Sequence, residues 1–408
     1  MEFPDLLERF LSYVKIDTRS DPDSETFPST GKQFDLARRL EEELVEMGLD
    51  NVFVNEYCYV SGFLKTNQVK EMPVIALIAH MDTSPDVTGT GVNPKVHRAY
   101  DGRDIVLSPD TTLRVDENPL LKEKTGKTII TSDGSTLLGA DDKAGVSEIM
   151  SAVNFLVKNP DYPRPNIRVV FTPDEEVGKG ADKISIDEIG AYAGYTVDGD
   201  RLGDLEDETF CADSVDIKIK GLNVHPGYAK GKMVNALKIA AEIIENLPAE
   251  AGAPENTEKR EGYIHPHVLT ASVDEAAIQI LIRDFEENGL VEKERLIGEA
   301  VNRISDKYPR AEISMVVKES YRNMKQVLDN YPEVLEKAEK AIKAAGLTPK
   351  RTSIRGGTDG ARLSFMGLPT PNLFTGGNNF HSRFEWIALE DMEKATEVIV
   401  RLMEVWAG

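Results

Sequence analysis

The sequence predicts an α/β protein that carries an inserted ferredoxin-like α+β module. Up to about residue 200, short apolar runs typical of buried strands alternate with helices that have one apolar face. The pattern then changes to a strand–helix–strand–strand–helix–strand succession, which is the order of a ferredoxin-like module. After this module the α/β pattern returns. We therefore expect one domain from residues 1–207 and 323–408, and a second domain, 208–322, inserted within it.

The first half of the chain predicts its elements in a regular order. A helix is expected from Ser29 to Gly48, because apolar residues recur at helical spacing, Ser29 or Thr30 can cap its start, and Gly48 suits its end. The segment 83–127 is too long for a simple connection, so it is expected to hold short strands or a functional loop. The other expected elements are strands at 52–54, 74–79, 128–131, 166–172 and 195–197, and a helix at 143–158.

The second half predicts the inserted module and the return to the first domain. Strict alternation of apolar and polar residues at 215–220 is typical of a half-exposed strand. The module continues with helices at 233–247 and 293–304 and with strands at 269–273, 276–282 and 311–318. A helix at 331–345 and a strand at 372–375 follow it.

Composition narrows the classes of function. The net charge of −22 argues against nucleic acid and against anionic membrane surfaces as partners. Solubility explains it most simply, although amine-bearing substrates or carboxylates gathered around a cation are also compatible. With two cysteines, a disulfide framework is not expected. The N-terminus lacks a basic segment followed by an apolar core, so we expect no signal peptide and a cytoplasmic protein.

Histidine or carboxylate side chains follow a strand or a short apolar run at five places. The carboxyl ends of strands in an open α/β sheet meet at one crevice, so these side chains can converge. Histidine with carboxylates suits zinc, with bonds of about 2.0–2.2 Å. The five places are His80 with Asp82, Asp141 with Asp142, Glu175 with Glu176, Asp198, and His381.

The number of candidate ligands predicts two metal ions. Two histidines and three carboxylates exceed what one tetrahedral zinc ion needs. They suit two ions about 3.5–4 Å apart that share a carboxylate and a water, an arrangement that promotes hydrolysis. Glu175 would then be free to act as general base, and Asp82 would orient the ring of His80.

Each motif alone has a simpler explanation. His80 and Asp82 can cap a strand end, and Asp141 and Asp142 can stabilise the start of a helix. Paired glutamates after a strand are usually solvated, and a single histidine is usually structural. The order of the motifs and their equivalent placement favour the joint interpretation.

The ordered set resembles the dinuclear zinc exopeptidases, a family that includes glutamate carboxypeptidases, aminoacylases and succinyl-diaminopimelate desuccinylase. The motifs are His80-Met81-Asp82, Gly139-Ala140-Asp141-Asp142-Lys143-Ala144-Gly145, Asp174-Glu175-Glu176-Val177-Gly178, Asp198 and His381. A narrower resemblance to the tripeptide aminopeptidases of this family extends from Leu6 to the C-terminus. It rests on the residues at 80–86, 171–180, 223–227, 354–361 and 372–377.

The resemblance implies a zinc-exopeptidase-like catalytic domain with a mixed, helix-flanked sheet, in which residues 208–322 form a lid domain. It implies that His80 and Asp198 hold one zinc ion and that Glu176 and His381 hold the other. Asp141 would bridge them, because the family pattern places the ligand two residues before the lysine. Glu175 would be the general base and Asp82 the residue that orients His80.

The resemblance also implies residues that bind the substrate. His225 resembles an oxyanion-binding histidine that dimeric relatives take from the partner subunit, so a homodimer is one expected assembly. Arg283 and Arg355 are candidates for binding the carboxylate of a peptide, since guanidinium binds carboxylate in bidentate fashion. The stretch Thr83-Ser84-Pro85-Asp86 belongs to the matching motif but has no assigned chemical role.

The expected function is hydrolysis of the N-terminal residue from tripeptides at a dinuclear zinc centre, with cobalt or manganese as substitutes. The alternatives are another amidohydrolase of the same family (a carboxypeptidase, a dipeptidase or an N-acyl amino acid deacylase) and, more remotely, a non-catalytic metal-binding scaffold. A nucleotide-binding α/β protein is disfavoured, because the glycine fingerprint of such proteins is absent from the sequence.

Overall fold

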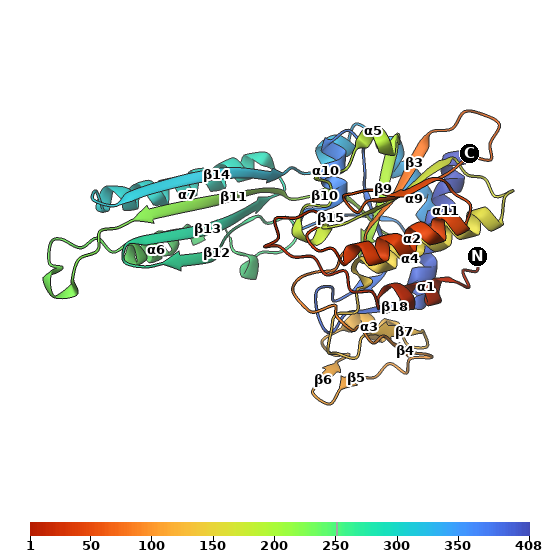
Figure 1. The fold of residues 1–408 in the computed structure, drawn as a ribbon, viewed down its shortest axis with the longest axis horizontal. Helices are drawn as coiled ribbons and strands as arrows, with labels where there is room; N and C mark the ends of the chain where they lie inside the picture. The colour runs from red at the N-terminus through yellow and green to blue at the C-terminus, as the bar shows by residue number, and fades with distance from the viewer. Residues whose placement is uncertain (250–251) are drawn as a thin grey trace. The chain divides into compact units, whose positions relative to one another are not determined.

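The computed structural model describes residues 1–249 and 252–408, which divide into two compact units (Figure 1). Unit 1 comprises Met1–Asp207, Met324–Thr352 and Thr358–Gly408. Unit 2 comprises Glu208–Asn323 and Ser353–Gly357. Each unit has its own sheet and its own hydrophobic core.

The centre of unit 1 is an eight-stranded mixed sheet. Strand β3 runs parallel to both β8 and β9, whereas β2 pairs with β8 in the antiparallel sense. Along the β3–β8 pair, His80 lies opposite Thr172, so both strands end at the same edge. In spatial order the strands are β1 (Asp50–Val54), β2 (Val60–Leu64), β8 (Asn166–Thr172), β3 (Val74–His80), β9 (Ala193–Gly199), β16 (Asn372–Phe374), β10 (Asp204–Thr209) and β15 (Lys350–Ile354).

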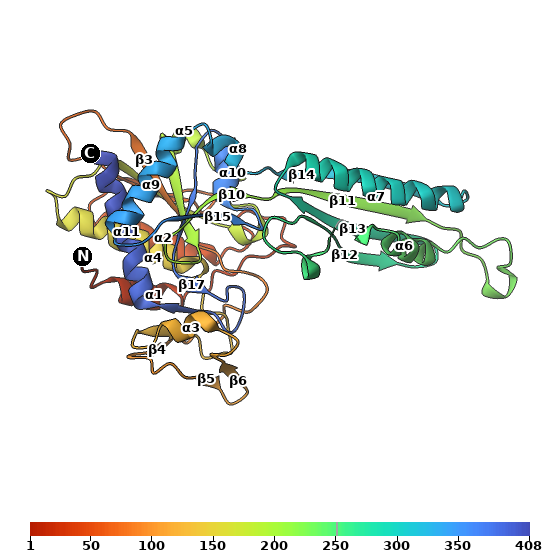
Figure 2. The ribbon, with the colours of Figure 1, turned by 180° about the vertical axis from the view of Figure 1, so that it is seen from behind.

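Helices cover both faces of this sheet (Figures 1 and 2). Ala76 and Ile78 of β3 pack with Ile189 and Leu363 on one face. The long helix α4 contacts β3 and β9, and α11 packs against α4 and α9. β3 therefore lies between layers of apolar side chains, which explains its continuous apolar sequence. The helices of unit 1 are α1 (Leu6–Tyr13), α2 (Gln33–Glu46), α3 (Pro119–Glu123), α4 (Ala140–Lys158), α5 (Ile186–Ile189), α8 (Lys325–Leu328), α9 (Pro332–Ala344), α10 (Asp359–Phe365) and α11 (Leu389–Ala407).

A smaller sheet accompanies the main one in unit 1. It has the order β17-β18-β7-β4, next to a hairpin of β5 and β6. Trp386, Ile129 and Leu121 are buried in its own small core. The segment 83–127 thus contains three short strands and α3, as its composition indicated. The strands are β4 (Lys95–His97), β5 (Ile105–Ser108), β6 (Thr111–Leu113), β7 (Ile129–Thr131), β17 (Gly377–Asn378) and β18 (Trp386–Ala388).

Unit 2 is an antiparallel sheet with two helices on one face (Figure 2). The strand order is β12-β13-β11-β14, which for strands numbered within the unit is the 2-3-1-4 order of a ferredoxin-like module. Alternate residues of β11, such as Val215 and Ile217, are buried against the helices. The elements are β11 (Cys211–Lys220), α6 (Ala236–Glu245), β12 (Tyr263–Ala271), β13 (Glu275–Asp284), α7 (Glu287–Lys307) and β14 (Glu312–Tyr321), with single 3-10 turns at Pro226–Tyr228 and Pro254–Asn256.

The strand at 166–172 has the bounds expected from the sequence, and most other expected elements lie within a few residues of theirs. The expected cap of α2 was wrong. The helix begins after Lys32 without a side-chain cap, because Ser29 instead hydrogen-bonds the carboxylate of Asp174. Gly48 does follow the end of this helix in the left-handed conformation, with φ of +80°. No helix among the described residues is long and apolar enough to span a membrane.

Helix α4 buries an ionisable residue that the catalytic motifs do not include. Glu148 is fully buried, and neither of its carboxylate oxygens has a hydrogen-bond partner among the described residues. Burial, followed by the nearby Asp391 carboxylate, raises the pKa of Glu148 well above its usual value. At pH values between the unfolded and folded pKa of Glu148, the folded protein therefore holds a proton that the unfolded chain has released.

We predict that Glu148→Gln removes a pH dependence of stability. A raised folded-state pKa gives stability that is complete below the unfolded pKa and is lost as pH rises toward the folded pKa. The variant should thus gain stability relative to the unaltered protein as pH rises from 5 to 8. Melting temperatures in chelator measure this, with the exposed Glu42→Gln on α2 as control. A difference that is constant with pH would contradict the prediction.

Candidate active site

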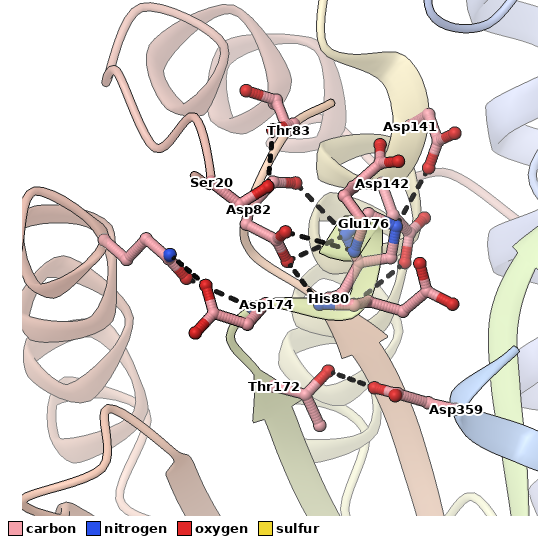
Figure 3. Close-up of polar contacts among 12 residues, drawn as sticks. Ser20, His80, Asp82, Thr83, Asp141, Asp142, Thr172, Asp174, Glu176 and Asp359 are labelled. Atoms are coloured by element: carbon pink, nitrogen blue, oxygen red, sulfur yellow. Dashed lines mark hydrogen bonds and ion pairs between the residues drawn. The ribbon is translucent and has the colours of Figure 1, made fainter. Parts of the chain in front are cut away.

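His80 is the last residue of β3 (Figure 3). Its side chain is 2% exposed. Its Nδ1 lies 3.1 Å from the main-chain oxygen of Asp82 and 3.4 Å from Asp82 Oδ1. Its Nε2 lies 2.9 Å from Asp141 Oδ1 and 3.5 Å from Asp198 Oδ1. Nδ1 thus contacts Asp82, and Nε2 faces the carboxylates of Asp141 and Asp198.

The two adjacent aspartates at the start of α4 have different partners. The oxygens of Asp141 face different histidines, with Oδ1 near His80 and Oδ2 3.1 Å from His381 Nε2. Asp142 instead accepts hydrogen bonds from the backbone N–H groups of His80 and Gly145, at 3.1 Å each. Asp142 therefore attaches α4 to the end of β3, while Asp141 lies between the two imidazoles.

His381 comes from the turn after β17 and faces Glu176 as well as Asp141. Its Nε2 lies 2.9 Å from Glu176 Oε2. The other oxygen of this carboxylate, Oε1, is buried and has no hydrogen-bond partner among the described residues. An unpaired buried carboxylate oxygen is costly, so a ligand that it can bind would stabilise this arrangement.

The side chains form two groups with the donors of a metal site. In each group, one ligand atom per residue lies within 4.8 Å of the others, and Asp141 belongs to both. Imidazole and carboxylate donors without a thiolate suit divalent ions such as zinc, cobalt or manganese. The residues therefore fit a dinuclear centre. The first group is His80, Asp141 and Asp198, and the second is Asp141, Glu176 and His381.

The electrostatics of the cluster also favour a cation. Burial and the neighbouring Asp141 carboxylate raise the pKa of Glu176 to about 8. Hydrogen bonds to Asp141 and Glu176 raise the pKa of His381 to about 11. Burial also raises the pKa of Asp198. The cluster thus binds positive charge strongly, either as protons or as metal ions.

Glu175 lies at the start of a 3-10 turn, Glu175–Val177, directly after β8. Its backbone N–H donates to Asp82 Oδ1 at 3.0 Å. The N–H of Glu176 donates to Asp82 Oδ2 at 3.2 Å, and Figure 3 shows these two residues. The side chain of Asp82 therefore positions both glutamates as well as the ring of His80. Burial raises the pKa of Glu175 well above its usual value.

Comparisons with known proteins identify the family. The model of Peptidase family M20/M25/M40 matches residues 132–405. The chain is 49% identical to peptidase T of Halothermothrix orenii over 404 residues, which cover 98% of this chain and 99% of that protein. It is 48% identical to peptidase T of Clostridium acetobutylicum over 406 residues, 99% of each chain. The chain belongs to the peptidase T family.

Solved structures confirm the predicted fold. Aminopeptidase PepT from Bacillus cereus has a TM-score of 0.77 at 24% identity and covers the whole of both chains. A tripeptidase from Staphylococcus aureus also has a TM-score of 0.77, at 22% identity, and the match covers 100% of this chain and 99% of that one. The α/β fold with a mixed sheet and a separate antiparallel sheet is thus that of the peptidase T family, and the chain is a metallopeptidase.

The sequence predicted three substrate-binding residues, and all of them lie in unit 2: His225, Arg283 and Arg355. His225 precedes a 3-10 turn, and its Nδ1 accepts from the N–H of Gly227. Arg283, on β13, lies over the ring of Tyr321. Arg355 donates hydrogen bonds to the carbonyl oxygens of Lys259 and Glu261 and to the Thr257 hydroxyl. The five candidate metal ligands all lie in unit 1.

Glu385 supports the site but was not predicted from the sequence. It is 1% exposed, and Oε2 accepts from the backbone N–H groups of Leu138 and Gly139, at 2.7 Å each. Oε1 accepts from the N–H of Asp141 at 3.0 Å. The carboxylate therefore fixes the loop that presents Asp141. Its closeness to His381 in the sequence was the one hint available, and that hint does not reveal these backbone partners.

Asp359, in the motif at 354–361, is a second supporting residue. It is the first residue of α10, it is buried, and it accepts a 2.8 Å hydrogen bond from the hydroxyl of Thr172 (Figure 3). Burial raises the pKa of Asp359 to about 7. This contact joins α10 to the end of β8, next to the turn that carries the two glutamates.

We predict that Glu385→Gln destabilises the metal-free protein by roughly 1–3 kcal/mol. The glutamine NH₂ would replace one carboxylate oxygen, so a donor would face backbone N–H donors that now have an acceptor. Chemical denaturation in chelator measures the effect. The matched control is Glu123→Gln, an exposed glutamate at the end of α3 that should change stability little. Equal stability of the two variants would contradict the role assigned to Glu385.

Proposed function

We propose that the chain is a tripeptide aminopeptidase that works with two zinc ions. The observation that carries the proposal is the pair of ligand groups that share Asp141, with Glu175 beside them, in a chain of the peptidase T family. His80 and Asp198 would hold one ion, and Glu176 and His381 the other. The bridging position of Asp141 is supported by its two oxygens, which face different histidines.

The ions held by these five residues would supply Lewis-acid activation of the scissile carbonyl and of a water molecule. Glu175 would take the proton of this water and deliver it to the leaving amine. Asp82 would keep Glu175 in place through the backbone N–H groups of the turn, and it would hold the ring of His80 through Nδ1.

The substrate would be a small peptide with a free N-terminus. Residues 208–322 would act as the lid domain, which is consistent with the compactness of unit 2. His225 would support the oxyanion, and Arg283 and Arg355 would bind the peptide carboxylate. If the lid closes in the substrate complex, such a carboxylate-binding site would limit peptide length and would favour tripeptides.

Glu175→Gln should retain both metal ions and lose most of its turnover. Removal of a general base typically lowers rates by about 10²–10⁴-fold, and the amide cannot accept the proton. Metal content and kcat for a free tripeptide measure the two effects. Glu188→Gln on α5 is the control and should keep full activity. A Glu175→Gln enzyme with most of its activity would show that another group is the base.

A peptide panel tests the substrate class. The zinc-reconstituted enzyme should release the N-terminal residue of a free tripeptide, and N-acetylation should lower kcat/KM by more than ~100-fold, because a polar site binds poorly an analogue that lacks the recognised group. The products are identified by mass spectrometry. Release of the C-terminal residue would indicate a carboxypeptidase, and release of the acyl group would indicate a deacylase.

A further inference from the structure

The stretch Thr83–Asp86 ends next to the second candidate histidine. Asp86 Oδ2 lies 3.4 Å from His381 Nδ1, while Nε2 of the same ring faces Asp141 and Glu176. We propose that Asp86 is a positioning residue that holds the His381 imidazole so that Nε2 points toward a metal ion. This inference rests on the proposed dinuclear centre and gives a role to a stretch that had none.

The contact at His381 resembles the one at His80. His80 Nδ1 lies 3.1 Å from the main-chain oxygen of Asp82 and 3.4 Å from its Oδ1, and His381 Nδ1 lies 3.4 Å from Asp86 Oδ2. A carboxylate at Nδ1 favours the tautomer with its proton on that nitrogen, which leaves the Nε2 lone pair for a metal ion. Each histidine thus has a carboxylate near Nδ1, which a backbone oxygen supplements at His80.

Backbone contacts hold the stretch that carries Asp86. The N–H of Thr83 donates to the carbonyl of Thr18 at 3.3 Å, and the N–H of Ser20 donates to the carbonyl of Thr83 at 3.1 Å. The guanidinium of Arg19 donates to the carbonyl oxygen of Pro85, with Nε at 3.2 Å. The residue before Asp86 is therefore anchored to the segment 18–20, and the approach of Asp86 to His381 does not depend on a free loop.

His381 needs such a partner more than His80 does. The His80 side chain is 2% exposed and is held by packing, whereas the His381 side chain is 40% exposed. The His381 backbone adopts φ of +58° on a surface turn, and Asp86 is its one Nδ1 partner among the described residues. Asp141 and Glu176 contact the His381 ring at Nε2, and Asp86 adds a contact on the opposite, Nδ1 side. Because packing constrains this half-exposed ring less than it constrains His80, the Asp86 carboxylate contributes more to its orientation.

The effect should be moderate. Carboxylates that orient metal-binding histidines typically contribute about 10–100-fold to metal affinity. The Asp86 side chain is 67% exposed, so water and salt screen its charge. We therefore expect a loss close to 10-fold at the ion that His381 binds, and less than 2-fold at the ion that His80 binds.

Metal titration against a competing chelator tests the inference. Zn²⁺ and Co²⁺ affinities of both ions are measured for Asp86→Ala and Asp86→Asn, and His381→Ala identifies which ion His381 binds. The visible spectrum of bound Co²⁺ reports ligand geometry independently of turnover. The control is Asp110→Asn, which removes the same charge from the exposed turn between β5 and β6. Melting temperatures in chelator exclude a folding defect.

The inference predicts that the Asp86 variants weaken the ion bound by His381 about 10-fold and change its Co²⁺ spectrum, while the control matches the unaltered enzyme. Unchanged affinity for both ions in the Asp86 variants would overturn the inference and leave the proposed function intact. An equal loss of metal affinity in Asp110→Asn would show that removing any negative surface charge has this effect. That result would also overturn the inference. If the unaltered enzyme bound fewer than two ions, the dinuclear centre would fail, and the inference with it.

Discussion

The site is organised around the carboxylate of Asp82, which connects the end of β3 with the turn after β8. Both oxygens accept backbone hydrogen bonds from that turn, and Oδ1 also faces the ring of His80. The parallel register places His80 opposite Thr172, so the chain after β8 needs only two more residues to bring Glu175 within reach. One buried carboxylate thus sets the relative positions of a candidate ligand, a candidate base and a second ligand.

Six carboxylates at the site are of two kinds, and the distinction explains how the cluster can exist. Asp82, Asp142 and Glu385 accept hydrogen bonds from backbone N–H groups, which offset the cost of burying a charge and fix the loops they join. Asp141, Asp198 and Glu176 instead face imidazoles and one another. Their mutual repulsion makes them suited to a divalent cation, and the first kind prevents the loops from relaxing away.

The sequence predicted well which residues lie at the ends of strands. It did not predict the hydrogen bonds between distant residues that hold the loops of the site in place. His80, Asp198 and Glu176 follow apolar runs, so their convergence at one edge follows from strand direction alone. The choice of Asp141 over Asp142 came from a family pattern, because both are equally acidic and adjacent. Glu385 was missed because its partners are backbone N–H groups of residues some 245 positions earlier, which no side-chain pattern reveals. The cap expected from Ser29 or Thr30 was wrong for the same reason, since Ser29 donates to the buried Asp174 and the Thr30 hydroxyl donates to the carbonyl of Arg19.

The two histidines reach the cluster by different physical routes. His80 is fixed by the sheet core, whereas His381 stands on a turn where packing contributes little, so an electrostatic contact has to replace what burial supplies to the first ring. Asp82 and Asp86 both belong to the turn that follows β3, and this turn is anchored to residues 18–20. On this proposal a single turn supplies a carboxylate to each histidine. The length and composition of the stretch after His80 are then set by two contacts rather than one, because Asp82 must turn back toward β8 while Asp86 continues outward to His381.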